Sequence, residues 1–398
     1  MFLEPVFIRD KLENEESRFE GGSVPASFGS EFRLDPATGL WALIAEGRGA
    51  RPSNAEDDSA TGDRDPNCAF CPGNESQTPK LVLAAVENES GEVELLEPGA
   101  DPELARRPWI ARVFENKYPV FRISPNSPEP PAYAEIVSGF EAPFSAIPAI
   151  GRHEVIVDTP RHIRSWSEFT DREIKWAFRI FRARLRALRN SGRFERAFVF
   201  KNVGSGAGAS QRHSHCQLVG EVKLPPSAIE ELKRLLVLTQ TARRSGDPRS
   251  YWNAILDAEL RAKERVIAAS ERFVVHCPFA SRYPMQVEIC PRFGEALEDY
   301  SDEALDELAL LARRTVAALE TAKRLKLPND PSPLDYNVVM RATPNRMATP
   351  FEELEGVARP RWVFLPSLVK KAGYEIGSGI DINPVSPETA ATILREVF

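Results

Sequence analysis

The sequence predicts an α+β fold made of two similar halves. The order strand, helix, strand, loop, strand occurs between residues 152 and 217 and again between residues 273 and 369. Each copy has one long stretch of helical periodicity, at residues 165–190 and 301–325, between short stretches with the pattern of strands. A repeat well above ~100 residues indicates a duplicated α+β unit and not a solenoid of short repeats.

In the first half, residues 32–44 (FRLDPATGLWALI) predict a hairpin that turns between Asp35 and Gly39. Residues 152–158 alternate as a strand does. The helix that follows presents apolar residues at helical spacing, and Ser167 or Thr170 can cap its start. These apolar residues are Phe169, Ile174, Phe178, Phe181, Leu185 and Leu188. A strand at 196–202 and a glycine-rich loop then lead into a strand that carries two histidines.

In the second half, residues 273–292 predict paired strands, residues 301–325 a long amphipathic helix, and residues 335–342 and 361–369 two more strands. Residues 111–121 also resemble residues 273–284. The segment opposite the histidine strand reads RPRWVFLP, which has no histidine. We therefore expect the chemistry in the first half only. The polar stretches 1–30 and 51–65 predict arms or loops.

The composition is that of a globular protein: 398 residues, 42% hydrophobic, with a net charge of −7. The absence of a long basic block argues against nucleic acid or an anionic membrane as the main partner. The acidic N-terminal stretch and the lack of a long apolar run predict a cytoplasmic protein. Five cysteines, of which only two have a recognisable spacing, argue against a disulfide framework.

Residues 211–217 read QRHSHCQ, and they contain two of the five histidines in the chain. On an extended strand, alternate side chains face the same side, so His213, His215 and Gln217 project together at a spacing of roughly 7 Å. The sequence thus predicts one polar face on this strand.

A pair of cysteines, Cys68 and Cys71, stands in the turn-rich stretch DPNCAFCPGN. Two thiolates at this spacing can bind one zinc ion if two more ligands come from elsewhere, although a redox pair or chance can produce the same spacing. Because the chain has no second CxxC, histidines must complete such a site. The candidates are His153, His162, His213, His215 and His276.

The run GSGAGAS precedes the histidine strand. Its small residues let backbone N–H groups approach phosphate oxygens closely, as anion-binding turns require. An ordinary flexible turn has the same composition, so the position of the run directly before the histidine pair is what favours phosphate binding.

Seven stretches, in order, resemble the galactose-1-phosphate uridylyltransferase branch of the histidine-triad superfamily, close to its ADP-glucose-phosphorylase-type and bacterial transferase members. They are FRLDPATGLWALIAEGRGARP, DPNCAFCPGNE, RVFENKYPVF, GRHEVIVDTPRH, VFKNVGSGAGASQRHSHCQ, CPFASRYPMQVEICPR and AGYEIGSGIDINPVSPE. The resemblance implies two tandem histidine-triad-like halves, each an antiparallel sheet with a long packing helix. We expect an arm at 1–30, a catalytic half with the zinc knuckle at 31–220, and a half without the histidines at 221–398.

The resemblance also implies catalytic roles. His215 would be the nucleophile that forms a nucleotidyl-histidine, and Gln217 would donate its amide to a phosphate oxygen. Hydrolytic relatives have histidine in place of this glutamine, which favours transfer. The substrate-binding residues implied are Arg48, Arg51, Asn116, Asn202, Gly208, Ser210, Tyr374 and Glu375. Lys370 or Lys371 would meet the sugar phosphate, although GYEIGSG read without the resemblance predicts a strand ending in a turn.

The zinc ligands implied are Cys68, Cys71, His162 and His213. Four protein ligands make a closed, structural site. His153 is then expected to be a packing or surface residue, and His276 has no assigned counterpart. Because Arg359 and Arg361 replace histidines in the second half, we predict no second metal. Active sites in the family are completed across a dimer, so a homodimer is expected.

We therefore predict a nucleotidyltransferase of carbohydrate metabolism that acts on nucleotide sugars through nucleotidyl-His215, with a hexose 1-phosphate as acceptor, as in galactose metabolism. Ser214, between the two histidines, matches the phosphorylase-type relatives, so an ADP-sugar phosphorylase with orthophosphate as acceptor is the alternative. A diverged non-catalytic nucleotide-binding protein and a nucleotide hydrolase also remain open. The choice of base and the role of Arg212 are not decided by the sequence.

Overall fold

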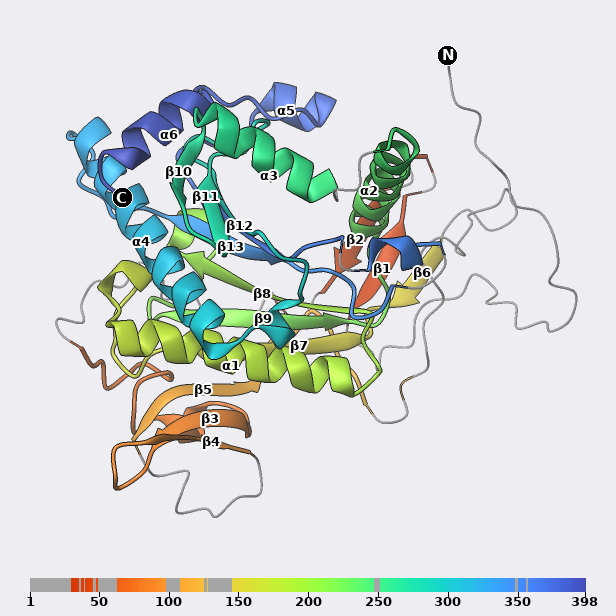
Figure 1. The fold of residues 1–398 in the computed structure, drawn as a ribbon. Coiled ribbons are helices and arrows are strands. Elements are labelled where there is room, and N and C mark those ends of the chain that lie inside the picture. Colours follow the sequence, from red (N-terminus) through yellow and green to blue (C-terminus); the bar gives the residue numbers. More distant parts are fainter. Residues whose placement is uncertain are drawn as a thin grey trace, which may run out of the picture.

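The computed structural model describes residues 30–35, 37–38, 40–45, 48, 63–97, 108–124, 127, 145–246, 251–347, 350–355 and 357–398. The predicted arm at 1–30 and the predicted loop at 51–65 fall almost wholly outside these residues. Within them, a long twisted sheet carries helices on both faces, and a small second sheet lies at its side (Figure 1). No described helix combines the length and apolar composition that a membrane span requires.

The large sheet has the strand order β10-β11-β12-β14-β13-β8-β9-β7-β5-β3-β4, and all its pairings are antiparallel. The first-half strands are β3 (Leu81–Glu87), β4 (Val93–Leu96), β5 (Trp109–Glu115), β7 (Gly151–Val157), β8 (Arg196–Val203) and β9 (His215–Glu221). The second-half strands are β10 (Val266–Ala269), β11 (Phe273–His276), β12 (Val287–Pro291), β13 (Tyr336–Arg341) and β14 (Arg361–Pro366).

Each half consists of antiparallel strands and a long helix, as predicted. They do not form two separate sheets, however, because β8 of the first half pairs with β13 of the second over residues 200–203 and 336–339. Backbone hydrogen bonding is therefore continuous across the predicted boundary. The division of the chain at residue 220 stays a prediction.

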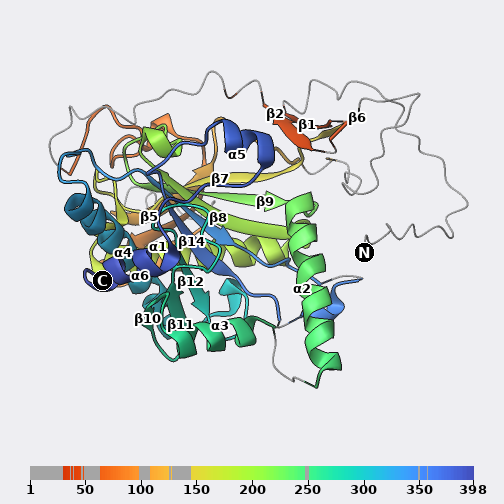
Figure 2. The same cartoon turned by 90° about the horizontal axis from the view of Figure 1, so that it is seen from above.

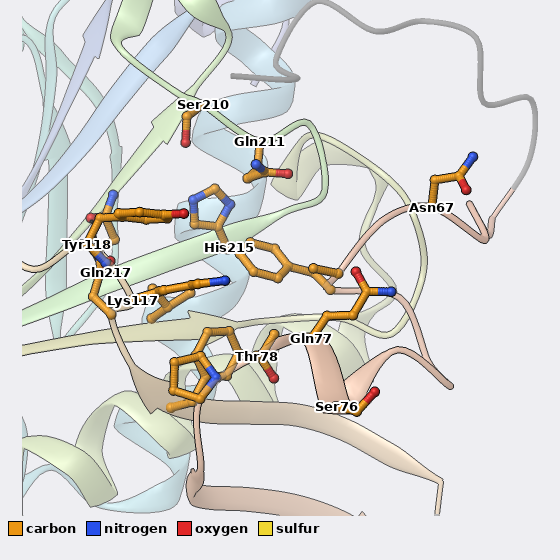
Figure 3. Close-up of a pocket in the computed structure, with 16 residues that line it drawn as sticks. Asn67, Ser76, Gln77, Thr78, Lys117, Tyr118, Ser210, Gln211, His215 and Gln217 are labelled. Carbon is orange, nitrogen blue, oxygen red and sulfur yellow. Dashed lines mark hydrogen bonds between the residues drawn. The ribbon is translucent and has the colours of Figure 1, made fainter. Parts of the chain in front are cut away.

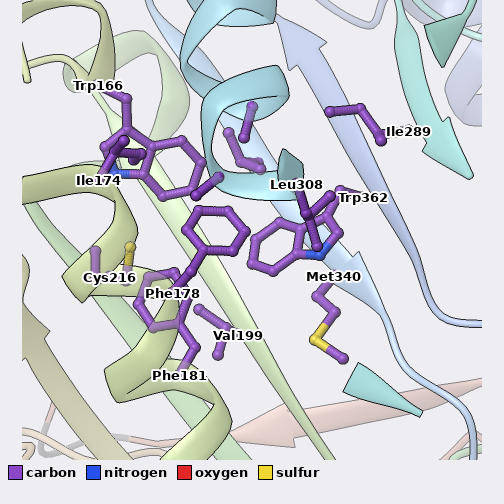
Figure 4. Packing of buried hydrophobic residues seen from close by; sticks show 14 of the residues in the cluster. Trp166, Ile174, Phe178, Phe181, Val199, Cys216, Ile289, Leu308, Met340 and Trp362 are labelled. Atoms are coloured by element: carbon purple, nitrogen blue, oxygen red, sulfur yellow. The ribbon is translucent and has the colours of Figure 1, made fainter. Parts of the chain in front are cut away.

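Helices α1 (Asp171–Asn190) and α4 (Asp302–Lys326) pack side by side on one face of the large sheet (Figure 1). The aromatic residues of the predicted helix are buried there: Phe178 and Phe181 contact Trp362 of β14, with ring centroids 4.9 and 6.0 Å apart (Figure 4). Trp362 thus joins the two halves in one core. Burial of apolar surface on this scale is the main stabilising contribution to the fold.

The predicted hairpin is present as β1 (Glu31–Leu34) and β2 (Trp41–Ile44), and β6 (Ser145–Pro148) adds a third strand. Asp35 Oδ1 accepts hydrogen bonds from the N–H groups of Ala37 and Thr38, which stabilise the turn. Phe32 and Leu43 pack against Val219 of β9, so the small sheet lies against the large one on the face opposite α1 (Figure 2).

Helix α3 (Tyr251–Ala262) packs on β11 and β12 on the face opposite α4. Helix α2 (Pro226–Arg244) packs against α3 and the short helix at residues 352–354, and α6 (Pro387–Arg395) packs near β10. One secondary-structure prediction is wrong. Residues 373–378 form helix α5 (Gly373–Ser378), not a strand, and Gly379 ends it at φ 72°, a conformation that glycine adopts without strain.

Thr170 caps α1, as one of the two predicted caps. Its hydroxyl accepts from Glu173 N–H, and the Glu173 carboxylate accepts from Thr170 N–H at 2.8 Å. Arg161, next to His162, donates to the same carboxylate at 2.7 Å. Burial raises the pKa of Glu173, but the hydrogen bonds from Arg161, Thr159 and Thr170 outweigh it and lower the pKa to about 2.

The Glu173→Gln variant should lose about 1–3 kcal/mol of stability at neutral pH, because it loses charge-assisted hydrogen bonds. The folded-state pKa lies below the ordinary 4.5, so the contribution is complete above pH 4.5 and is lost as the pH falls towards 2. Urea unfolding should therefore show a difference between variant and wild type that shrinks below pH 4.5. A difference that is the same at pH 3 and pH 7 would contradict this prediction.

Candidate active site

A cavity of about 570 Å³ lies at the start of β9, with His215 in its wall (Figure 3). Its polar lining includes Ser210, Gln211, Gln217, Asn116 and Lys117, and its apolar side is formed by aromatic and aliphatic side chains around Phe70. The remaining lining residues are Asn67, Ala69, Ser76, Gln77, Thr78, Pro79, Phe114, Tyr118 and Val155. An apolar slot beside a polar strand suits a ligand that joins a flat ring to charged groups.

His215 is buried, and Phe70 holds its ring edge-on at a centroid distance of 5.2 Å. Its Nδ1 lies 2.8 Å from the carbonyl oxygen of His213, so Nδ1 carries the proton and donates it to that oxygen. In the neutral ring the lone pair is then on Nε2. The hydrogen bond forms where the chain enters β9, and it makes Nε2 the unprotonated nitrogen of the ring.

Gln217 follows His215 on the same face of β9, as the alternation predicted, and it lines the same cavity. Its Oε1 lies 2.9 Å from Nε2 of His153 on the neighbouring strand β7. His153 is thus a buried partner of a candidate site residue, where the sequence predicted a packing or surface residue.

A buried ion pair supports β9 from the face opposite Gln217. Lys201 Nζ lies 3.1 Å from Asp158 Oδ2 and donates to Ser214 Oγ at 2.6 Å and to the His215 carbonyl at 3.2 Å. Both charged side chains are almost wholly excluded from solvent. Removal of one partner would leave an uncompensated buried charge, which is strongly destabilising. Because Lys201 also donates to the His215 carbonyl, the ion pair helps to fix the backbone at that residue.

This ion pair was not predicted from the sequence, although a signal was present. Along β8, Ala197, Val199 and Val203 alternate onto the helix-covered face, and Lys201 falls in the same register. A lysine in a core register requires a buried acceptor. Only the structure shows that Asp158, 43 residues earlier, provides it.

The four predicted metal ligands come together. Cys68, Cys71, His162 and His213 are all buried, with ligand atoms within 4.8 Å of one another. His213 Nδ1 lies 3.7 Å from Cys68 Sγ and 3.5 Å from Cys71 Sγ, and His162 Nδ1 lies 3.4 Å from Cys71 Sγ. Bonds of ~2.3 Å to sulfur and ~2.0 Å to nitrogen put tetrahedral neighbours about 3.6 Å apart. The geometry fits one ion.

The surroundings also prepare these groups for a metal. His213 Nε2 donates to the Thr159 carbonyl at 2.9 Å, which leaves the Nδ1 lone pair facing the sulfurs. Burial lowers the pKa of His213 to about 3, so the ring is neutral, as a ligand must be. Burial also raises the pKa of the Cys68 thiol to about 12, so a thiolate forms here only beside a cation.

The glycine loop has a different hydrogen-bonding pattern from the one predicted. Gly206 N–H donates to Asp335 at 2.7 Å, and the N–H groups of Ala207, Gly208 and Ala209 donate to carbonyls within the loop. These four groups are therefore already engaged. Gly204 has φ 82°, a conformation that is strained for any residue with a side chain, and a Cβ there would also lie 1.9 Å from Asp335 Oδ1. Ser210 and Gln211, which follow the loop, are the residues that reach the cavity.

The other predicted binding residues are dispersed. Asn116 lines the cavity, and Arg48 donates to the Tyr118 carbonyl at 2.7 Å beside it. Asn202 accepts a hydrogen bond from Asn337 at 2.9 Å, and Gly208 ends the short helix of the loop at φ 78°. Arg51 lies outside the described residues.

The predicted sugar-binding segment lies apart from this cavity. Tyr374 is on α5 with 58% of its surface exposed, and Glu375 accepts from Ala372 N–H. Neither is among the described residues that line the cavity of His215. Lys371 pairs with Asp381 at 2.7 Å. Arg212 lines a neighbouring cavity with Arg164 and Asp335.

A second group of potential metal ligands was not predicted. His276 of β11 and Glu288 and Cys290 of β12 lie within 4.8 Å of one another in the second half, all buried. Arg361 approaches the Glu288 carboxylate at 3.4 Å and donates to Glu231 at 2.8 Å. On β14 the Arg361 side chain lies on the face of the sheet opposite α1 and α4, as the His215 side chain does on β9. A guanidinium thus brings positive charge to this cluster.

Comparison with known proteins supports this description. Residues 110–225 match the family described as galactose-1-phosphate uridyl transferase, N-terminal domain. The chain is 27% identical to the ADP-glucose phosphorylase of Arabidopsis thaliana over 92% of its own length and 93% of that protein. It is 22% identical to the galactose-1-phosphate uridylyltransferase of Haemophilus influenzae, over 91% and 93%.

The fold agrees with these similarities. The crystal structure of an ADP-glucose phosphorylase from Arabidopsis thaliana with bound ADP-glucose superposes with a TM-score of 0.63 at 25% identity, covering 93% of this chain and 99% of that one. The antiparallel sheet with a long helix in each half, and the histidine pair in the first, match the histidine-triad-like fold that the motifs predicted. The recognition made from the motifs is confirmed. The chain is similar to galactose-1-phosphate uridylyltransferases and to an ADP-glucose phosphorylase, and it is an enzyme of the nucleotidyltransferase type.

Proposed function

We propose that the protein transfers a nucleotidyl group from a nucleotide sugar by double displacement through His215. In the first step Nε2 attacks the α-phosphorus, a P–N bond forms, and the bond from that phosphorus to the bridging oxygen breaks. The sugar 1-phosphate leaves. In the second step a phosphate oxygen of the acceptor attacks the same phosphorus and the P–N bond breaks, which frees His215.

The observation that carries this proposal is the tautomer of His215. The ring donates Nδ1–H to the His213 carbonyl, so Nε2 is unprotonated, and His215 lines a cavity that also contains amide and ammonium donors. Gln217 and Lys117 are suited to neutralise charge on the phosphate oxygens in the transition state. The apolar wall around Phe70 and Phe114 is suited to the base.

We further propose that the ion in the cluster of Cys68, Cys71, His162 and His213 is zinc with a structural role. Four protein ligands leave no open position for substrate. His213 is two residues from His215, so this cluster ties the nucleophile's strand to the N-terminal knuckle. The chain's own residues perform the transfer.

For the acceptor we propose a hexose 1-phosphate, as the family motifs predict. Orthophosphate is the second candidate, and two observations favour it: the identity to an ADP-glucose phosphorylase extends over 92% of the chain, and serine separates the two histidines. The two acceptors share the attacking group, a phosphate oxygen, so the same nucleotidyl-histidine serves both.

The purified enzyme should convert one pairing of donor and acceptor faster than the others. UDP-glucose and ADP-glucose are each offered with galactose 1-phosphate or with orthophosphate, and the nucleotide products are quantified by chromatography. We expect exchange with galactose 1-phosphate. Activity confined to ADP-glucose with orthophosphate would replace the first candidate by the second without affecting the role of His215. Release of free nucleoside monophosphate alone would identify a hydrolase.

A further inference from the structure

His153 stands on β7 directly beside the catalytic strand. In the pairing of β7 with β9, Val155 is opposite Gln217 and His153 is opposite Val219, so both polar side chains project from the same face of the sheet. Both are buried, at 4% and 3% exposure. His153 Nε2 lies 2.9 Å from Gln217 Oε1, a distance that requires one proton between them.

The backbone determines where that proton is. Val120 N–H donates to His153 Nδ1 at 3.1 Å, so Nδ1 is unprotonated. The neutral ring then carries its proton on Nε2 and donates it to Gln217 Oε1. Asn116 is oriented by Tyr118 N–H, which donates to its Oδ1 at 2.8 Å. Its Nδ2 lies 3.1 Å from His153 Nε2 and 3.5 Å from Gln217 Oε1. Because the protonated Nε2 cannot accept a hydrogen bond, the N–H groups of both side chains are directed at the glutamine oxygen.

Two donors that converge on Oε1 fix the orientation of the Gln217 amide. The reversed amide would bring its NH₂ against the Nε2–H group of His153, and a buried donor facing another donor is unfavourable. The reversal would also turn a carbonyl oxygen towards the phosphate. With Oε1 held by His153, the NH₂ group is the end of the amide that remains to donate. Gln217 and His215 line the same cavity (Figure 3).

We propose that His153 is a positioning residue that directs the NH₂ group of Gln217 at the phosphate during nucleotidyl transfer. The proposal rests on the nucleotidyl transfer proposed above for His215. His153 itself touches neither substrate nor the reacting atoms. Its effect is on how strongly Gln217 stabilises charge in the transition state, and therefore on the rate of transfer more than on substrate binding.

Two substitutions separate the donor from the rest of the imidazole. Asparagine at position 153 keeps an acceptor near Val120 N–H but is too short to reach Gln217, whereas the longer glutamine can donate to it. In single-turnover labelling with an α-labelled nucleotide sugar, His153→Asn should slow formation of the covalent adduct about 10–100-fold. His153→Gln should recover most of the rate, and Kd for the donor should change less than about threefold in both.

Three controls complete the experiment. His276→Asn removes another buried histidine, remote from the cavity, and should label at the wild-type rate. Gln217→Ala should be slow, and adding His153→Asn to it should slow it no further, because the positioned group is already absent. Metal content and melting temperature are measured for every variant, to separate a slow enzyme from an unfolded one.

The outcomes distinguish failure of the positioning role of His153 from failure of nucleotidyl transfer through His215. A slow Gln217→Ala enzyme with a wild-type rate in His153→Asn would overturn the positioning role alone. The positioning role would also be overturned if the loss of labelling rate in the double variant equalled the product of the losses in Gln217→Ala and His153→Asn alone. Failure of the wild-type enzyme to form any covalent adduct would overturn the proposed function together with this inference.

Discussion

Replacement of His215 by alanine should abolish both the covalent nucleotidyl adduct and steady-state transfer. In the proposed mechanism His215 Nε2 is the atom that attacks the phosphorus. We therefore expect kcat to fall at least about 10⁴-fold without it, as for other covalent nucleophiles. The label in the wild-type protein should be stable in alkali and labile in acid, as a phosphoramidate is. The measurement is radiolabel retained on denatured protein.

The His215→Ala protein should otherwise resemble the wild type. His215 is not among the proposed metal ligands, so metal content should be unchanged, and the main chain at this position remains bonded to Lys201. His276→Ala provides the matched control, since it removes a buried histidine outside the cavity. Transfer at the wild-type rate by His215→Ala would refute the mechanism.

The second large effect is expected from loss of the metal. Elemental analysis should find about one zinc ion per chain, and Cys68→Ser or His213→Ala should lower both the zinc content and the melting temperature. The cluster joins residues 68–71 to residue 213, so it closes a long loop of chain. We expect a loss of at least about 3 kcal/mol, a fraction of the ~10–16 kcal/mol that zinc contributes in zinc-finger peptides.

A matched control comes from the second group of potential ligands. Cys290→Ser alters the cluster of His276 and Glu288, where Arg361 already brings a positive charge, and it should leave the zinc content unchanged. Chelators should inactivate the wild-type enzyme slowly, through unfolding. Two tightly bound metals per chain, with one lost in Cys290→Ser, would disprove the prediction of a single site.

Much of the site could be predicted because it depends on local chain geometry. The period of two along an extended strand places His215 and Gln217 on one face wherever the strand lies in the fold. His213, which was predicted on the same strand, lies in a bend just before it. The CxxC spacing likewise brings Cys68 and Cys71 together through a turn. Neither pattern required knowledge of which strands are neighbours.

Contacts between distant segments could not be predicted in this way. Strand order and register determine which distant residues meet. They bring His153 to Gln217 and Asp158 to Lys201. They also bring Asp335 to the N–H group of Gly206 in the glycine loop. The helix at 373–378 was missed for a related reason. Its sequence, GYEIGS, has weak local preferences, and its state depends on the surrounding structure.

The sequence by itself determined the repeated α+β order, the helical core faces and the shared face of His215 and Gln217, because these depend on periodicity and spacing along the chain. The tertiary structure decided that the two halves share one sheet through β8 and β13. It also decided which buried polar groups meet. The physical reason is that an unpaired buried donor, acceptor or charge is costly, so each must find a partner across strands, and only the register between strands determines which partner that is.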